Sequence, residues 1–426
     1  MLTSTMTVTF LGTSSGGGPS TSRNCSSLVA DVLGDGSLWM VDCAEGTLRQ
    51  FQLQPLYSAD RSNPRLSQVK KIFITHMHAD HVMGIVPILR NLLFPVPVGE
   101  NADKLQALRK PHPAIEIYGP AGIRTFIRSI LKMTFTRMSD NYVVHELLAS
   151  ADQATSCDPK VMHPNEVAGE DIFCSAGDGL WRVVAQGKGI FGPVVVDAGP
   201  IIHRDPCIGY VFRETAKPFH PSPSLLIHEA ADAYIPQEID PKSKRSYDAV
   251  KEKALARGHS LPEMAGAFAR TIGAQKLVLN HLGGRFPLPN PNEGYRVKSI
   301  RSNVIAEIER QATEAWGMGT ARAAWDFMRV AIPSTSPNMP QTATQDELVD
   351  HTIRHPASLA GHPTAYNTWE TSDTATSPDP PSYATTASRS QYRVGEGRST
   401  RYSRNAGGFR QHSSQRRGNF DNADPL

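Results

Sequence analysis

The chain has 426 residues and a nearly balanced charge, +3 at pH 7, so net charge alone predicts no nucleic-acid partner. Its five cysteines are scattered without a Cys-x-x-Cys pair, which argues against a disulfide scaffold or a zinc ribbon and favours a reducing compartment. No run approaches the ~18 apolar residues of a membrane span, and no secretory or clear mitochondrial signal is visible, so we expect a protein of the nucleus or cytoplasm without membrane contact.

In the N-terminal part of the chain, short apolar runs alternate with turn residues. Strands are predicted at residues 8–11, 27–31, 38–42, 69–74 and 115–118. The sequence Gly34-Asp35-Gly36 predicts a hairpin turn between the second and third of these strands. Helices are predicted at residues 47–53, 82–93 and 123–133, although Pro87 lies inside the second of them.

The middle of the chain continues with strands and then gives way to helices. Further strands are predicted at residues 194–196, 209–212, 225–227 and 277–279. Ser260 and Glu263 form a capping-box pattern, which predicts a helix that ends at Gly273, and two more helices are predicted at residues 304–316 and 321–329. This order of elements predicts an α/β (α+β) sandwich of two sheets with outer helices, formed by residues 1–332.

The composition changes sharply near Pro333. Residues 333–388 are rich in Ser, Thr, Pro and Ala, and we expect a disordered linker because such a segment buries too little apolar surface to offset its chain entropy. Residues 389–426 form a disordered tail that carries eight arginines with interleaved aromatic residues, a composition typical of flexible RNA-binding tails. A solvated tail without a partner is an equally good interpretation.

The stretch Thr75-His76-Met77-His78-Ala79-Asp80-His81 is the most informative part of the chain. It places three imidazoles and one carboxylate directly after the apolar strand predicted at residues 69–74. His76 and His78 are predicted to reach one metal ion, and Asp80 and His81 a second ion beside it. Neutral imidazole and carboxylate suit zinc, and this spacing is hard to explain as a polar loop whose histidines face solvent.

A site for two metal ions needs ligands from elsewhere in the chain. His203 precedes one predicted strand and His281 follows another, and the ends of neighbouring strands converge on one edge of a sheet. Two ions that share a hydroxide lower the pKa of bound water to about 7 and stabilise both oxygens of a displacement, which predicts hydrolysis of a phosphodiester, ester or amide. Glu229, at a strand end, and His259, at the N-cap of a helix, are candidates for protonating the leaving oxygen.

Taken together, these residues resemble the metallo-β-lactamase superfamily, and within it the tRNase Z family of tRNA 3′-processing endoribonucleases. The resemblance covers residues 7–330, and the histidine cluster alone carries it only as far as the superfamily. The further motifs are Phe10-Leu11-Gly12-Thr13, Arg23-Asn24-Cys25-Ser26-Ser27, Val41-Asp42-Cys43-Ala44-Glu45-Gly46-Thr47, Tyr118-Gly119-Pro120, Gly209-Tyr210-Val211-Phe212, Leu226-Ile227-His228-Glu229-Ala230, Gly258-His259-Ser260 and Asn280-His281.

The resemblance implies an αβ/βα sandwich, two zinc ions and usually a homodimer. It implies removal of the 3′ trailer from precursor tRNA by attack of a metal-activated hydroxide on a phosphodiester, which leaves a 3′-hydroxyl. The implied ligands of one zinc ion are His76, His78 and His203, and those of the other are Asp80, His81 and His281. Asp80 is further implied to orient the attacking water, and Glu229 and His259 to assist proton transfer to the leaving group.

Three further residues are candidates for substrate binding: Arg23, Asn24 and Arg285. Arg23 and Asn24 belong to one of the motifs that carry the resemblance. Arg285 follows His281 closely and is a candidate for a phosphate contact, but an ordinary surface arginine is an equally good interpretation.

One departure from the family pattern lies between Phe212 and Leu225. The family has a long segment here, with an arm that grips the tRNA and a Gly-Asp-Thr element whose aspartate bridges the metals. This chain has only the twelve residues 213–224, without a Gly-Asp pair, and Gly177-Asp178 lies on the wrong side of His203. The loss predicts weaker metal binding, particularly at the second site.

The missing segment leaves several interpretations open. We favour a shortened gene model or splice form, because the surrounding motifs are intact, over an active variant or a catalytically weak RNA-binding relative. Another hydrolase of the same fold, acting on a small ester or a cyclic nucleotide, is the remaining alternative.

Overall fold

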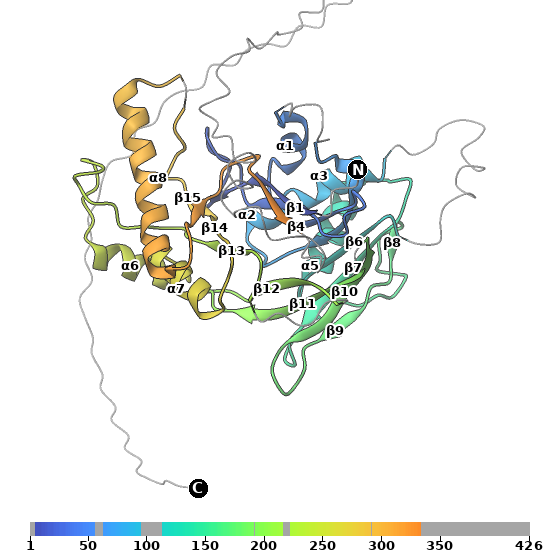
Figure 1. Cartoon of the computed structure of the whole chain (residues 1–426). Helices are drawn as coiled ribbons and strands as arrows, with labels where there is room; N and C mark the ends of the chain where they lie inside the picture. The colour runs from blue at the N-terminus through green and yellow to red at the C-terminus, as the bar shows by residue number, and fades with distance from the viewer. Residues whose placement is uncertain are drawn as a thin grey trace, which may run out of the picture. The chain divides into compact units, whose positions relative to one another are not determined.

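The computed structural model describes residues 5–55, 63–94, 113–190, 192–215, 222–290 and 292–333 (Figure 1). These residues all belong to the first of two structural units in the chain, Met1–Pro363. Apart from Pro333, the predicted linker and the predicted arginine-rich tail lie outside the described residues.

The largest part of the fold is a sheet of nine strands in the order β17-β1-β3-β4-β5-β6-β7-β8, with β9 also paired to β7. The strands are β1 (Thr5–Gly12), β3 (Ser27–Asp31), β4 (Leu38–Cys43), β5 (Val69–Phe73), β6 (Ile115–Pro120), β7 (Tyr142–Leu148), β8 (Glu166–Val167), β9 (Asp171–Phe173) and β17 (Arg329–Pro333). From β4 to β7 the strands run parallel. The antiparallel pairing of β3 with β4 confirms the predicted hairpin.

The two faces of this sheet pack against different layers, because neighbouring side chains of a strand point in opposite directions. Ile72 of β5 shares a hydrophobic cluster with Ile88 of α3 (Ile85–Leu92) and Ile127 of α5 (Ile123–Met133). Phe73, the next residue, shares a second cluster with Val196 of β11 (Gly192–Ile201). Helices therefore cover one face of the large sheet, and a second sheet covers the other.

Three smaller sheets complete the described structure. The first joins β10 (Trp181–Gly189), β11 and β12 (Cys207–Glu214), the second joins β13 (Leu226–Glu229), β14 (Leu277–Asn280) and β16 (Arg322–Ala323), and the third pairs β2 (Ser14–Ser15) with β15 (Leu282–Gly283). The remaining helices are α1 (Thr47–Leu53), η1 (Leu66–Gln68), α2 (Ala79–Val82), α6 (Tyr247–Ala256), α7 (Pro262–Thr271) and α8 (Tyr295–Trp316). Figure 1 shows α7 and α8 next to β13 and β14, and the residues of these elements share one hydrophobic cluster. The predicted α/β sandwich of sheets with outer helices is confirmed.

The helix predicted at residues 82–93 is two helices, α2 and α3, separated by Met83 and Gly84. The chain must bend at Gly84, which packs so tightly that an added Cβ would lie 2.0 Å from the carbonyl oxygen of Ala44. Pro87 then falls in the first turn of α3, where a missing N–H leaves no hydrogen bond unmade. The prediction of one continuous helix was therefore wrong.

Two other local predictions were wrong. The N-cap of α7 is Leu261 rather than Ser260, and no side chain caps this end, because Pro262 begins the helix and Glu263 instead accepts a hydrogen bond from Tyr247. The helix predicted at residues 321–329 is replaced by β16, a turn and the start of β17. Pairing of β16 with β14, and of Arg329 in β17 with β1, overrides the local helical preference of this segment.

Strand ends place most of the predicted site residues near one another. His76 follows β5, Glu229 is the last residue of β13, and His281 follows β14. His203 lies in the turn between β11 and β12. No helix in the described part of the chain is both long and apolar enough to cross a membrane.

Candidate metal centre

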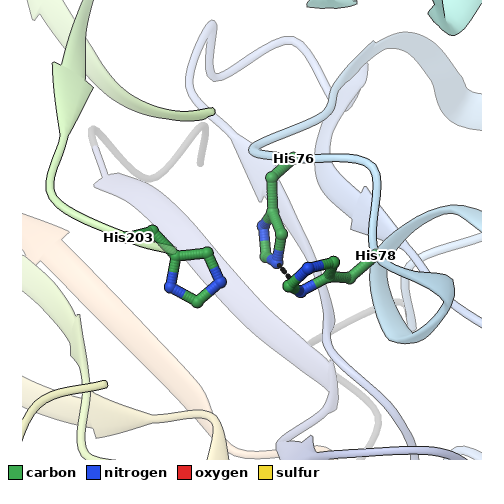
Figure 2. Close-up of side chains that lie close together, drawn as sticks. All are labelled: His76, His78 and His203. Atoms are coloured by element: carbon green, nitrogen blue, oxygen red, sulfur yellow. Dashed lines mark hydrogen bonds between the residues drawn. The ribbon is translucent and has the colours of Figure 1, made fainter. Parts of the chain in front are cut away.

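The structure brings His76, His78 and His203 together, and Figure 2 shows their three rings converging from two separate loops. The Nε2 atom of His76 lies 2.9 Å from Nδ1 of His78. The centroid of the His203 ring lies 4.8 Å from that of His76 and 5.2 Å from that of His78. One nitrogen from each of the three residues therefore faces a shared space, as the first predicted ligand set requires.

Asp80, His81 and His281 form a second group beside the first. The Oδ2 atom of Asp80 lies 3.7 Å from Nε2 of His81 and 3.7 Å from Nε2 of His281. The rings of His81 and His76 have centroids only 4.0 Å apart, so the two groups adjoin. The six residues predicted as ligands thus lie in the two predicted sets, and their role as ligands stays a proposal.

Hydrogen bonds hold the outward nitrogen of several of these rings. Nδ1 of His81 donates to Oδ2 of Asp42 over 2.7 Å, and Nδ1 of His203 donates to the carbonyl oxygen of Gly258 over 2.9 Å. These bonds leave Nε2 of His81 and Nε2 of His203 buried without a hydrogen-bond partner. A buried imidazole nitrogen without a partner is unusual unless it binds a metal ion. The residues present therefore fit a pair of metal ions.

The electrostatics of the cluster favour neutral rings at His76 and His281, whereas at His81 burial is outweighed by the neighbouring Asp42 and Asp80, which raise the pKa. Burial and the neighbouring histidines lower the pKa of His76 to about 2, and burial together with His81 lowers the pKa of His281 to about 3, so both rings are neutral at pH 7. Burial alone would raise the pKa of Asp80, but the nearby His81 and His281 bring that pKa below its ordinary value. Asp80 is therefore a carboxylate.

Asp42 supports the cluster in a role that the sequence analysis did not assign. Its carboxylate accepts hydrogen bonds from His81 and from both the amide and the hydroxyl of Thr75. Both Asp42 and His281 have a φ of +56°, a left-handed conformation that costs non-glycine residues energy. Such strained positions gather at functional sites. The signals in the sequence were the position of Asp42 at the end of a predicted strand and its place in one of the motifs that carry the family resemblance.

Glu229 and His259 form the carboxylate–imidazole pair that was predicted. Nδ1 of His259 lies 2.9 Å from Oε2 of Glu229, and the amide of Ser260 donates to Oε1 over 2.8 Å. Burial raises the pKa of Glu229, but these hydrogen bonds and the nearby His281 outweigh burial and lower it. The His259 ring lies 5.9 Å from that of His281. His259 precedes the N-cap residue of α7 by two positions, which corrects its predicted place at the N-cap.

A cavity of about 630 Å³ opens beside the second ligand group. Asp80, His259 and His281 contribute to its wall. Five basic residues also line it: Arg204, Arg245, Lys253, Arg257 and Arg285. Of these, the sequence analysis had proposed only Arg285 as a site residue. The acidic residues in the wall are Asp80 and Asp232, so positive charge dominates and the cavity suits an anionic ligand.

The three predicted substrate-binding residues have different surroundings. Arg23 is 2% exposed, and its guanidinium donates to the hydroxyl of Thr13 and to the carbonyl oxygen of Ala324. Burial lowers the pKa of Arg23 to about 10. The side chain of Asn24 is also buried and donates to the carbonyl oxygen of Glu45 over 3.0 Å. Both side chains are buried and donate hydrogen bonds to the scaffold, so this geometry gives no support to substrate contact by Arg23 or Asn24, and that role stays a prediction.

Arg285 lies in the wall of the cavity, as a residue in contact with substrate would. Its Nε atom lies 2.8 Å from Oδ1 of Asp232, and its guanidinium also donates to the carbonyl oxygen of Ala233. Asp232 also pairs with Arg245 at 3.0 Å. Two arginines thus share one carboxylate, which leaves a net positive charge on this side of the cavity.

The fold and its histidine groups are those of a metal-dependent hydrolase, and residues 21–127 match the family model of the metallo-beta-lactamase superfamily. Ribonuclease Z of Prochlorococcus marinus strain MIT 9301 is 30% identical to this chain in an alignment that covers 67% of this chain and 90% of that protein. The chain therefore belongs to the ribonuclease Z family, a family of metal-dependent phosphodiester hydrolases.

Two human matches agree with this assignment. Human zinc phosphodiesterase ELAC protein 1 is 27% identical, and the alignment covers 77% of this chain and 99% of that protein. The crystal structure of the short form of human tRNase Z matches with a TM-score of 0.50, covering 77% of this chain and 100% of that one. The sequence alignment runs over 390 positions but falls on only 77% of 426 residues, so parts of the human protein have no counterpart here. This agrees with a missing segment.

Proposed function

We propose that the chain is a zinc-dependent endoribonuclease that removes the 3′ trailer from precursor tRNA. The observation that carries the proposal is the position of the two ligand groups, which adjoin both a basic cavity and the Glu229–His259 pair. The family membership supports the same reaction. Assembly as a homodimer stays a prediction.

Different residues of the site would serve different steps of the reaction. Zinc ions at the two groups would activate a water molecule and offset the negative charge that develops at phosphorus. The basic cavity supplies charge for the phosphates next to the cleaved bond, because phosphate contacts dominate the affinity for nucleic acid. Asp80 lies at the edge of this cavity, where its carboxylate can accept a hydrogen bond from the attacking water.

His259 is placed to protonate the oxygen that leaves. Glu229 accepts the hydrogen bond from Nδ1, which leaves Nε2 as the free ring nitrogen of a residue that lines the cavity. When the phosphodiester is cleaved to leave a 3′-hydroxyl, the departing atom is the 3′ oxygen of the tRNA. A proton on Nε2 can pass to that oxygen, while the Glu229 carboxylate stabilises the charged ring.

Cleavage of a precursor tRNA with mapped ends tests the proposal. We expect one major cut that yields a 3′-hydroxyl on the tRNA, abolished by a chelator and restored by zinc. His259→Ala is expected to slow this cut, whereas Asp178→Ala, at an exposed turn away from the site, is expected to leave it unchanged. Hydrolysis of only small esters or cyclic nucleotides would favour the other hydrolase, and RNA binding without cleavage would favour the non-catalytic relative.

A further inference from the structure

Asp205 links the two loops that carry the first ligand group. It lies in the turn between β11 and β12, two residues after His203, and its Oδ2 atom lies 2.6 Å from Nε2 of His78. Close by, the amide of Ile208 donates to the carbonyl oxygen of Thr75 over 2.9 Å. A side-chain contact and a backbone contact therefore join the loop of His203 to the loop of His76 and His78.

The contact with Asp205 sets which nitrogen of His78 carries the proton. Nδ1 of His78 faces Nε2 of His76 at 2.9 Å, so Nδ1 is the atom that points into the shared space of the ligand group. A carboxylate only accepts hydrogen bonds, so its partner, Nε2 of His78, must be the protonated nitrogen. Nδ1 then keeps its lone pair, which a metal ion requires.

Arg204 competes for the same nitrogen. Its Nη2 atom lies 3.3 Å from Nε2 of His78, and a hydrogen bond from this guanidinium would move the His78 proton to Nδ1 and block the metal-facing side. Asp205 opposes this arrangement in two ways. Its own contact with Nε2 is shorter, 2.6 Å, and the same Oδ2 atom accepts from Nε of Arg204 over 3.2 Å.

We propose that Asp205 is a positioning residue that fixes His78 in the Nε2-protonated form and so presents Nδ1 to the first metal ion. The inference rests on the proposed function, because it takes the first histidine group to be a metal site. Asp42 gives His81 the equivalent support from a buried position, and the backbone carbonyl of Gly258 gives it to His203. Asp205 differs because its side chain is 53% exposed, so water competes for His78 and the carboxylate charge is needed to hold it.

The test is the zinc affinity of the full chain, measured by competition with a chromogenic chelator. We expect Asp205→Ala to weaken one of the zinc sites about tenfold, the lower end of the effect of losing such a supporting partner. The matched control is Asp178→Ala, which removes another half-exposed aspartate paired with an arginine, Arg182, and is expected to change nothing. Long-range ¹H–¹⁵N NMR of the zinc-free chain should show a histidine that loses its Nε2-protonated form only in Asp205→Ala.

The same measurement in a chain that also carries Arg204→Met distinguishes control of the His78 tautomer from simple neutralisation of the Arg204 charge. If Asp205 acts on His78, Asp205→Ala should still lower zinc affinity when Arg204 is replaced by methionine. Full recovery of zinc affinity in that double variant, without a change of the His78 tautomer in Asp205→Ala, would overturn the proposal, as would an unchanged affinity and tautomer in Asp205→Ala alone. A wild-type chain that binds zinc normally while cleaving no RNA would sink the proposed function but leave the role of Asp205 intact.

Discussion

The carbonyl oxygen of Gly258 accepts a hydrogen bond from Nδ1 of His203 over 2.9 Å, and this contact depends on glycine. Gly258 has a φ of +71°, and an added Cβ would lie 2.5 Å from the backbone nitrogen of Arg204. We therefore expect Gly258→Ala to push the loop away, release the His203 ring and lower zinc affinity about tenfold. Chelator competition on the purified variant measures this change.

The control for this variant is Gly177→Ala. Gly177 lies in an exposed turn, and an added Cβ would meet nothing closer than 3.8 Å. We expect this variant to bind zinc like the wild type. Unchanged zinc affinity in Gly258→Ala would show that the loop does not hold His203 in place.

Replacing Glu229 should separate proton transfer from metal binding. Glu229 accepts from both His259 and the amide of Ser260, and glutamine keeps only one acceptor oxygen for these two donors. We expect Glu229→Gln to slow single-turnover cleavage of precursor tRNA by about 10²–10⁴-fold, the usual contribution of a positioned general acid, with zinc content unchanged.

Exposed Glu238 provides the comparison for Glu229. Glu238→Gln removes the same charge outside the cavity wall and should cleave at the wild-type rate. Full activity of Glu229→Gln would remove the Glu229–His259 pair from the mechanism. A parallel loss of zinc from Glu229→Gln would instead assign Glu229 to metal binding, since it also lies in a group with His259 and His281.

The position of the metal cluster was predictable because strand ends converge in space. The apolar runs before His76 and His281 identify β5 and β14, but these strands belong to different sheets, so the two histidines meet where the ends of separate sheets adjoin and not at the edge of one sheet, as the sequence analysis assumed. Local patterns succeeded wherever they matched tertiary packing, as in α5, whose predicted range is the observed one. Ser260 shows the opposite case, because its amide is used by Glu229 instead of its side chain capping α7.

The supporting contacts could not be predicted, because they join distant parts of the chain. Nothing near Arg23 in the sequence indicates that its guanidinium donates to the carbonyl oxygen of Ala324. The sequence analysis therefore treated Arg23 as a residue available to the substrate. The basic cavity is likewise assembled from residues between Arg204 and Arg285 that share no local motif. Asp42 and Asp205 support their histidines across 39 and 127 positions of sequence.

Zinc content tests the loss of the bridging aspartate. Among the described residues, two carboxylates belong to these side-chain groups: Asp80 lies in the second ligand group, and Glu229 lies in a group with His259 and His281. Neither of them belongs to both ligand groups. Two adjacent cations with less negative charge between them repel more strongly. We therefore expect fewer than two zinc ions per chain at modest free zinc, measured by elemental analysis after equilibration. Two tightly held ions would contradict this account.

Deleting residues 389–426 tests the arginine-rich tail. If its eight arginines contact phosphates, deletion should weaken the affinity for precursor tRNA and flatten its dependence on salt, because fewer counterions are released. Cleavage of RNA at saturating concentration should be unaffected, since the proposed site lies before residue 333. Filter binding at several salt concentrations gives both values. An unchanged affinity and salt slope would leave the tail as a solvated segment.

The last prediction concerns Asp326 and the stability of the zinc-free chain. Burial raises the pKa of Asp326 from 3.8 to about 6, although hydrogen bonds from Asn24, Thr13 and Gln50 oppose this rise. The unfolded chain releases this proton near pH 4 and the folded chain only near pH 6. The stability that Asp326 contributes is therefore present below pH 4 and lost as pH rises toward 6, a change of about 3 kcal/mol.

Asp326→Asn should remove this part of the pH dependence, because asparagine does not titrate. Urea unfolding of both proteins with a chelator present, at pH 4.5 and pH 7, isolates the effect from zinc release. We expect the free energy of unfolding of the wild type, measured relative to that of Asp326→Asn, to be smaller at pH 7 than at pH 4.5. A difference that stays constant or rises with pH would mean that Asp326 is ionised throughout, held by its hydrogen bonds and by Arg23, whose charge also opposes the rise.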